Sequence, residues 1–189
     1  MIVFKENGNV FMATSAADFI TSVDRRLGET EENVPMFGLS DGKTVIGLDT
    51  INITVADAVR YGNIEVPEIL DERALFANLI PQIKETLSNY GYGKNPLSST
   101  GVVVLRGERA FACFGDIMIH EIGEYYSVGA CDQLEFALLD KTREIKGEER
   151  IRKIYNIRDD CLGRRYSPII YIDTKTRKLH FIKTDDRSR

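Results

Sequence analysis

The side chains that could do chemistry are few, and their spacing is not typical of a ligand set. The three cysteines, Cys113, Cys131 and Cys161, are an odd number at wide spacing and lack the C-x-x-C pairing of a metal site. Each is therefore expected to be a small buried side chain. His120 and His180 lie in strand-like segments without a second ligand at metal-binding spacing. The sequence predicts no metal site and no cofactor.

Two other groups of residues could take part in catalysis or ligand binding. Asp159 and Asp160 could form a carboxylate pair for acid–base work, but adjacent residues of a helix do not face each other. A solvated helix end is therefore the favoured interpretation. The stretch GYGKNP lacks the spacing of a phosphate-binding loop and follows a helix pattern where such a loop would follow a strand. Spacing alone identifies no active site.

The chain opens directly in a strand pattern. The stretch MIVFKENGNVFMATS predicts strands at 2–5 and 9–14, joined by a tight turn at Asn7-Gly8. Chain termini are usually poorly ordered unless something ties them down. A first residue that begins a core hairpin therefore raises the question of whether the terminus itself has a chemical role.

The rest of the sequence alternates strands with pairs of helices. We expect a polar connection at 18–33, a hairpin at 34–39 and 43–48, and a short helix at 54–61. A long helix should follow at 68–89, which Pro81 kinks or breaks. The remaining elements are four strands at 102–105, 110–114, 117–122 and 125–128, helices at 132–145 and 148–161, and a closing hairpin at 168–172 and 178–183. This order is typical of an α+β fold in which helices cover antiparallel sheets.

Composition narrows the class of protein. The chain has 189 residues, 43% hydrophobic and 29% charged, with a formal charge of -4, which is typical of a globular domain and not of a nucleic-acid binder. We expect one domain over 1–183 and a polar tail at 184–189. The sequence has no apolar run long enough to span a membrane and no signal-peptide pattern, so we expect a cytoplasmic protein that binds neither membranes nor nucleic acid.

Several phrases, taken in order, resemble the proteasome β subunit and the HslV-type peptidases. The first hairpin of that family resembles GNVFMAT, and its second hairpin and first helix resemble LSDGKTVIGL followed by TVADAVRYG. Its central strands and next helix resemble VVVLRGERAFACFGDIMIHEIGEYYSVGACDQLEFALLD. Its last helix and closing strand resemble RIRKIYNIRDDCLGRRYSPIIYID. The resemblance covers about residues 2–183. It implies the four-layer αββα sandwich of the N-terminal nucleophile hydrolases.

In that family an N-terminal threonine attacks the peptide bond, and its own amine can serve as the base. The resemblance places Met1 about two positions after this nucleophile. The family's carboxylate matches Ser15, its strand lysine matches Pro35, and its oxyanion glycine step matches Leu48-Asp49-Thr50, where β-branched Thr50 would not easily take a glycine conformation. These mismatches predict that the family's mechanism has been lost.

The supporting positions of the family are matched only in part. Its small-residue serine matches Ala130, whereas its supporting aspartate matches Asp159, and Gly163 matches a further supporting glycine. Thr14, Ser15 and Cys131 are the nearest alternative nucleophiles by the same resemblance. Cys131 stands at an expected helix start, where a thiol pKa can fall, but a buried thiol is the favoured interpretation.

The sequence therefore predicts a catalytically silent, proteasome-β-like protein that acts by forming a homo-oligomer or by binding a protein or peptide partner. The acidic connection at 29–33 is a weak indication of where a partner would bind. The alternative is a threonine-type or cysteine-type peptidase or amidohydrolase that uses a displaced nucleophile or has a different true N-terminus.

Overall fold

The structure is a computed structural model that describes residues 1–15, 36–39, 41–49, 58–91, 101–114, 118–129, 132–163 and 168–182. The expected connection at 18–33, most of the short helix at 54–61 and the tail at 184–189 lie outside these residues. So do Pro35, Thr50, Ala130 and Cys131. Within the described residues, no helix is long and apolar enough to cross a membrane.

The strands form two antiparallel sheets. They are β1 (Ile2–Glu6), β2 (Asn9–Ser15), β3 (Met36–Gly38), β4 (Thr44–Asp49), β5 (Gly101–Arg106), β6 (Arg109–Phe114), β7 (Met118–Glu121), β8 (Tyr125–Ser127), β9 (Ile169–Asp173) and β10 (Leu179–Ile182). Sheet A has the order β10-β9-β2-β1-β8, and sheet B has the order β3-β4-β5-β6-β7. The two expected N-terminal hairpins and the closing hairpin are thereby confirmed.

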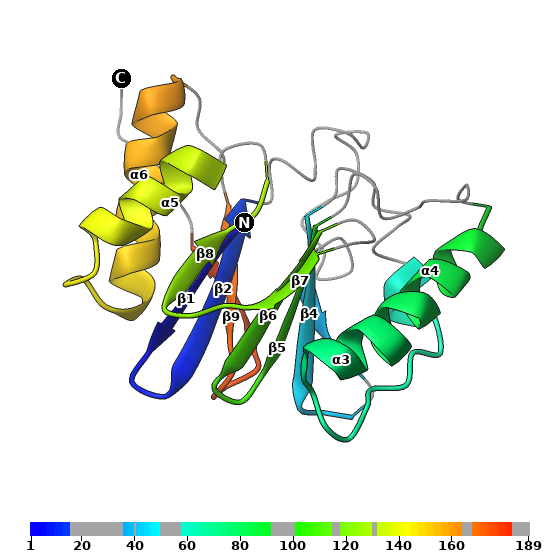
Figure 1. The fold of residues 1–189 in the computed structure, drawn as a ribbon. Helices are drawn as coiled ribbons and strands as arrows, with labels where there is room; N and C mark the ends of the chain where they lie inside the picture. The colour runs from blue at the N-terminus through cyan, green and yellow to red at the C-terminus, as the bar shows by residue number, and fades with distance from the viewer. Residues whose placement is uncertain are drawn as a thin grey trace.

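The helices lie on the outer sides of the two sheets (Figure 1). They are α3 (Glu72–Ala74), the π-helix η2 (Leu75–Leu79), α4 (Ile80–Asn89), α5 (Asp132–Lys141) and α6 (Gly147–Leu162). Helices α5 and α6 lie beside sheet A, whereas α3, η2 and α4 lie beside sheet B (Figure 1). The expected α+β class, with antiparallel sheets and helices, is confirmed.

The first hairpin is built by its turn and by burial on both faces. Asn7 and Gly8 both have positive φ, at 49° and 71°, which a two-residue turn of this hand requires. Strand β1 pairs with β2 on one side and with β8 on the other. Met1, Ile2, Val3 and Phe4 are all buried. The chain therefore does begin inside the core, in an interior strand of sheet A.

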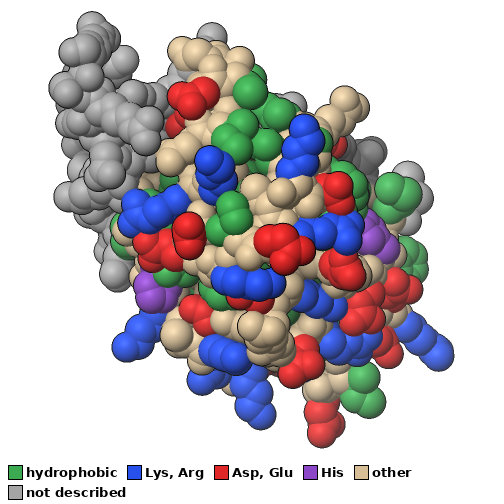
Figure 2. Space-filling view, turned by 90° about the vertical axis from the view of Figure 1, so that its left-hand side faces the viewer, with side chains coloured by type: hydrophobic (Ala, Val, Ile, Leu, Met, Phe, Trp, Pro, Cys, Tyr) green, Lys and Arg blue, Asp and Glu red, His purple; other side chains and the backbone are tan. Residues whose placement is uncertain are grey.

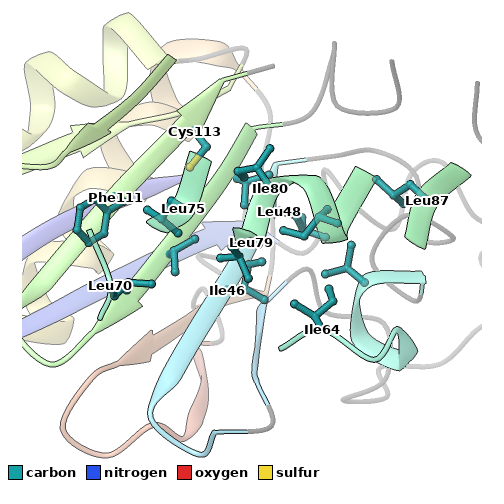
Figure 3. Packing of buried hydrophobic residues seen from close by; sticks show 14 of the residues in the cluster. Ile46, Leu48, Ile64, Leu70, Leu75, Leu79, Ile80, Leu87, Phe111 and Cys113 are labelled. Carbon is teal, nitrogen blue, oxygen red and sulfur yellow. The ribbon is translucent and has the colours of Figure 1, made fainter. Parts of the chain in front are cut away.

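Three apolar clusters fill the spaces between these elements. One lies between the sheets and includes Met1, Val3 and Val103. A second, with Ile2 and Ile154, joins sheet A to α5 and α6. The third joins sheet B to η2 and α4, whose leucine and isoleucine side chains point toward β4 and β6 (Figure 3). Each sheet is thus apolar on both faces, because each face has a partner layer.

Pro81 has the expected effect on its helix in a milder form. The chain stays helical from Glu72 to Asn89, but the turn before the proline is π-helical, and the Ile80 N–H donates to the Leu75 carbonyl. Pro81 has no N–H and would crowd the carbonyl four residues back in an α-helix. A wider π-helical turn accommodates the proline ring and its missing N–H without breaking the helix. At its start, Asp71 caps the helix by accepting a hydrogen bond from the Ala74 N–H at 2.7 Å.

Two expectations about single residues are wrong. Cys113 is buried as expected, but Cys161 is exposed in the last turn of α6. Asp159 is not part of a solvated helix end, because it is only 6% exposed and pairs with Arg158. The helical face that α6 buries extends to its last turn, so Asp159 falls on the inner side while Asp160 and Cys161 fall on the outer side.

Candidate functional site at the head of strand β1

Four strand ends meet beside the N-terminus. Because β1 runs antiparallel to β2 and β8, the start of β1 lies beside the ends of both, near Ser15 and Ser127. The end of β4 joins them from sheet B, since a Cβ placed on Gly129 would lie 2.9 and 3.1 Å from the carboxylate oxygens of Asp49. The N-terminus therefore lies where both sheets contribute residues to one site (Figure 1).

Met1 is held at this site by its backbone. Its amine donates to the Val128 carbonyl at 2.6 Å, and the Val128 N–H donates back to the Met1 carbonyl at 2.8 Å. This reciprocal pair extends the β1–β8 ladder to the first residue of the chain. Met1 therefore behaves as part of the sheet, and its amine is a buried donor.

The Met1 side chain lies between the two sheets. A Cβ on Gly47 of β4 would lie 2.5 Å from the sulfur of Met12 and 3.1 Å from the sulfur of Met1. Real side-chain atoms do not approach that closely, so the space that the two thioethers fill exists because position 47 is glycine. A thioether has no proton to give up and cannot act as the hydroxyl or thiol nucleophile of a hydrolase.

A buried ion network surrounds the amine. Glu135 of α5 lies 3.4 Å from the Met1 amine through Oε2, and the same oxygen accepts a hydrogen bond of 2.7 Å from the Ser127 hydroxyl. Its other oxygen accepts from Arg158 of α6 at 3.0 Å. Arg158 also donates to Asp159 at 3.0 Å. Two cations and two carboxylates thus balance one another inside the protein, as buried charges require.

The network sets the ionisation of its central carboxyl group. Burial acts to raise the pKa of Glu135, but the Met1 ammonium, the Ser127 hydroxyl and Arg158 outweigh burial and hold the pKa below its ordinary value of 4.5. For Arg158, burial acts to lower the pKa, but Tyr155, Glu135 and Asp159 raise it. Both side chains are therefore charged at neutral pH, and the carboxylate is a partner of the amine, not a proton donor.

Asp49 and Gly129 form the other side of the site. Gly129 has a φ of 120°, a backbone conformation that residues with a Cβ rarely adopt. The Asp49 carboxylate fills the space where a side chain at position 129 would lie. An acidic group thus occupies the step at which the resemblance places an oxyanion-binding glycine, and a carboxylate would repel a developing oxyanion.

The predicted site residues are only partly brought together. Asp49 lies beside Gly129, and Asp159 reaches the amine indirectly through Arg158 and Glu135. Ser15, at the end of β2, is 1% exposed, and Thr14 is 7% exposed. A metal site was not expected, and no group of His, Cys, Asp and Glu among the described residues could hold a metal ion.

Sequence reasoning missed the residues that contact the amine. Glu135, Leu138 and Leu139 share the buried face of α5, while Ile151, Ile154 and Arg158 share that of α6. A charged residue at an apolar position on each of two consecutive helices was the available signal for a buried ion pair. The partner amine could not be inferred, because it depends on the register between β1 and β8.

Comparisons with known proteins identify the fold. No protein-family model and no curated protein matches the sequence. Among solved structures, Thiobacillus denitrificans BPH in complex with epoxomicin matches at 11% identity and TM-score 0.69, covering 91% of this chain and 96% of that one. HslV from Trypanosoma brucei matches at 11% and 0.54, covering 97% and 98%. Anbu, an ancestral β-subunit from Yersinia bercovieri, matches at 11% and 0.57, covering 98% and 87%.

The chain therefore has the proteasome/HslV-like fold of the N-terminal nucleophile hydrolases, at a low level of sequence identity. The resemblance found in the sequence phrases is confirmed at the level of fold.

Proposed function

We propose that this chain is a catalytically silent proteasome-β-like protein, a pseudoenzyme that acts through self-association or partner binding. The observation that carries the proposal is the state of Met1. Its amine and carbonyl pair with Val128, its amine faces Glu135, and its thioether is packed between the sheets beside Met12. The place at the head of β1 that a nucleophile would need holds neither a hydroxyl nor a thiol.

The degenerate site in this proposal consists of Ser15, Pro35, Asp49, Thr50, Ala130, Cys131 and Asp159. Asp49 supports loss of oxyanion stabilisation, because its negative charge lies against Gly129. Asp159 supports a structural role, because its partner is Arg158. We further propose one four-layer αββα domain over 1–183, an arrangement that the three apolar clusters support.

The partner side of the proposal rests on the surface. Most soluble homo-oligomers are closed, and exposed large apolar side chains are candidates for the contacts between copies. The described residues of this kind are Tyr61, Ile69, Phe76, Tyr90, Met118, Phe136, Leu162 and Phe181. The face over α5 and α6 mixes acidic and basic side chains (Figure 2), which supports a protein or peptide partner over nucleic acid.

The displaced-nucleophile alternative has less support. Thr14 and Ser15 are buried within β2, where they pair with Ile170 and Ile169 of β9. Thr14 is 7% exposed and Ser15 is 1% exposed, so neither residue is open to a substrate. Cys131 lies outside the described residues.

A turnover assay tests the proposed silence. The full chain, at micromolar concentration, is incubated with a set of fluorogenic peptides that differ in the side chain before the scissile bond. We expect no release above the buffer rate, because no nucleophile stands at the head of β1. If pure protein shows turnover and either Ser15→Ala or Cys131→Ala abolishes it, the displaced-nucleophile alternative is favoured. Turnover that neither substitution changes would contradict the proposed silence and would not support that alternative.

A further inference from the structure

One open pocket adjoins the network around Met1 and shares Ser127 with it. Its volume is about 360 Å³, and it is lined by Tyr126, Ser127, Asp132, Gln133 and Phe136, from the end of β8 and the first turns of α5. Phe136 is 45% exposed, and its ring lies 6.5 Å from that of Tyr126 at an angle of 82°. Two aromatic rings set nearly at right angles thus present apolar walls to solvent.

Among the described residues, one negative charge at the pocket, that of Asp132, has no cationic partner. Asp132 is exposed, and its Oδ1 accepts from the Gln133 N–H at 2.7 Å, while its other oxygen has no partner among the described residues. Burial and the charge of Asp132 both raise the pKa of Tyr126, so the carboxylate acts on this ring. The network of Glu135, Asp159, Arg158 and the Met1 amine adds no net charge beside the pocket, because it contains two carboxylates and two cations. Aromatic faces beside a carboxylate favour an organic cation.

The pocket also adjoins the β8 edge of sheet A, where Tyr125 is partly exposed and Ser127 is 5% exposed. Among the described strands, β8 pairs with β1 alone. Its hydrogen bonds to β1 run through Val128 and Glu124, so the alternation of an antiparallel ladder turns the backbone groups of Tyr125 and Ser127 away from β1. Such an edge can pair with an extended segment of another chain.

We propose that the edge of β8 binds an extended segment of a partner polypeptide and that the pocket takes a lysine or arginine side chain of that segment. Backbone hydrogen bonds at the edge would supply affinity, and the aromatic and acidic pocket would supply specificity. The proposal rests on the partner-binding role proposed above and specifies its surface. Charge complementarity to Asp132 favours a basic side chain over an acidic or apolar one.

Peptide titration followed by NMR tests this. The probe is the acetylated and amidated pentapeptide Thr-Val-Arg-Val-Thr, and the matched control carries Glu in place of Arg. Titrated into the ¹⁵N-labelled full chain, the arginine peptide is expected to shift the amide resonances of Tyr125 and Ser127, and the glutamate peptide is not. Asp132→Asn and Phe136→Leu should each weaken binding by about fivefold. Glu149→Gln, which removes an exposed charge elsewhere, should leave binding unchanged.

The outcomes are distinct. Equal binding of both peptides, no binding at several millimolar, or shifts confined to other strands would overturn the proposal. Shifts of the β8 resonances with protein concentration alone would assign the edge to a second copy and overturn it as well. Mass spectrometry of the recovered peptide tests the proposed function separately, because cleavage would contradict catalytic silence whatever the binding result.

Discussion

At the scale of single residues, the main feature of the site is an ion pair between the N-terminal amine of Met1 and the side chain of Glu135. Glu135 contacts the Met1 amine, Ser127 and Arg158 while only 1% exposed. Removing one partner from a buried pair costs more than the pair contributes, because the remaining charge stays desolvated. Glu135 has two such cationic partners.

Glu135→Gln is therefore expected to lower the free energy of unfolding by about 3 kcal/mol at neutral pH. Chemical denaturation measures this, with exposed Asp160→Asn as the matched control that should change it by less than about 0.5 kcal/mol. An equal effect of both substitutions would show that the network around Met1 contributes no particular stability.

The pH dependence has a definite sign. Because the pKa of Glu135 is lowered on folding, its ionised form stabilises the native state above the ordinary pKa of 4.5, and this contribution is lost as pH falls through the lower pKa of the folded protein. The melting temperature of the unmodified protein should therefore fall more steeply below pH 4.5 than that of Glu135→Gln.

At the scale of elements, sequence periodicity predicted much of the fold. The Asn7-Gly8 turn, the strand-like runs rich in Ile, Val and Phe and the apolar stripe of 75–87 correctly predicted the first hairpin and the long helix, because these signals are local. What could not be predicted depends on contacts between elements. The buried positions of Glu135 and Asp159 are examples, since charge alone suggests an exposed residue and only the packing of α5 and α6 on sheet A buries it.

The site could be predicted less well than the fold. Asp49 and Asp159 were identified by resemblance. Gly129, which lies against Asp49, follows a strand of the other sheet, and Glu135, which pairs with Arg158 beside Asp159, comes from another helix, so no local pattern encodes these contacts. The role of Gly47 could not be predicted either, because the sequence does not indicate which side chain fills the space beside a glycine in a strand.

The packing between sheets gives a prediction at this scale. Gly47→Val places side-chain atoms where the sulfur of Met12 lies, so we expect a loss of about 2 kcal/mol in unfolding free energy. Combining it with Met12→Ala should recover part of that loss, and the two substitutions should not be additive. Denaturation of the two single variants and the double variant measures this coupling. Strict additivity would contradict the proposed contact.

At the scale of the whole molecule, the proposed self-association predicts an oligomer in solution. Closed homo-oligomers are the common form of soluble assemblies. Size-exclusion chromatography with light scattering at micromolar concentration should give a mass that is a multiple of the monomer. A monomer alone, with no dependence on concentration, would contradict self-association and leave partner binding as the remaining role.

The most direct test of the central claim uses epoxomicin, the ligand of the similar Thiobacillus protein. Native mass spectrometry of the full chain with excess epoxomicin reports both the mass of the mature chain and any complex. With Met1 paired to Val128 and its amine facing Glu135, we expect no stable epoxomicin complex. A stoichiometric complex, or a mature chain that starts with an exposed threonine or serine, would show that the site is catalytic.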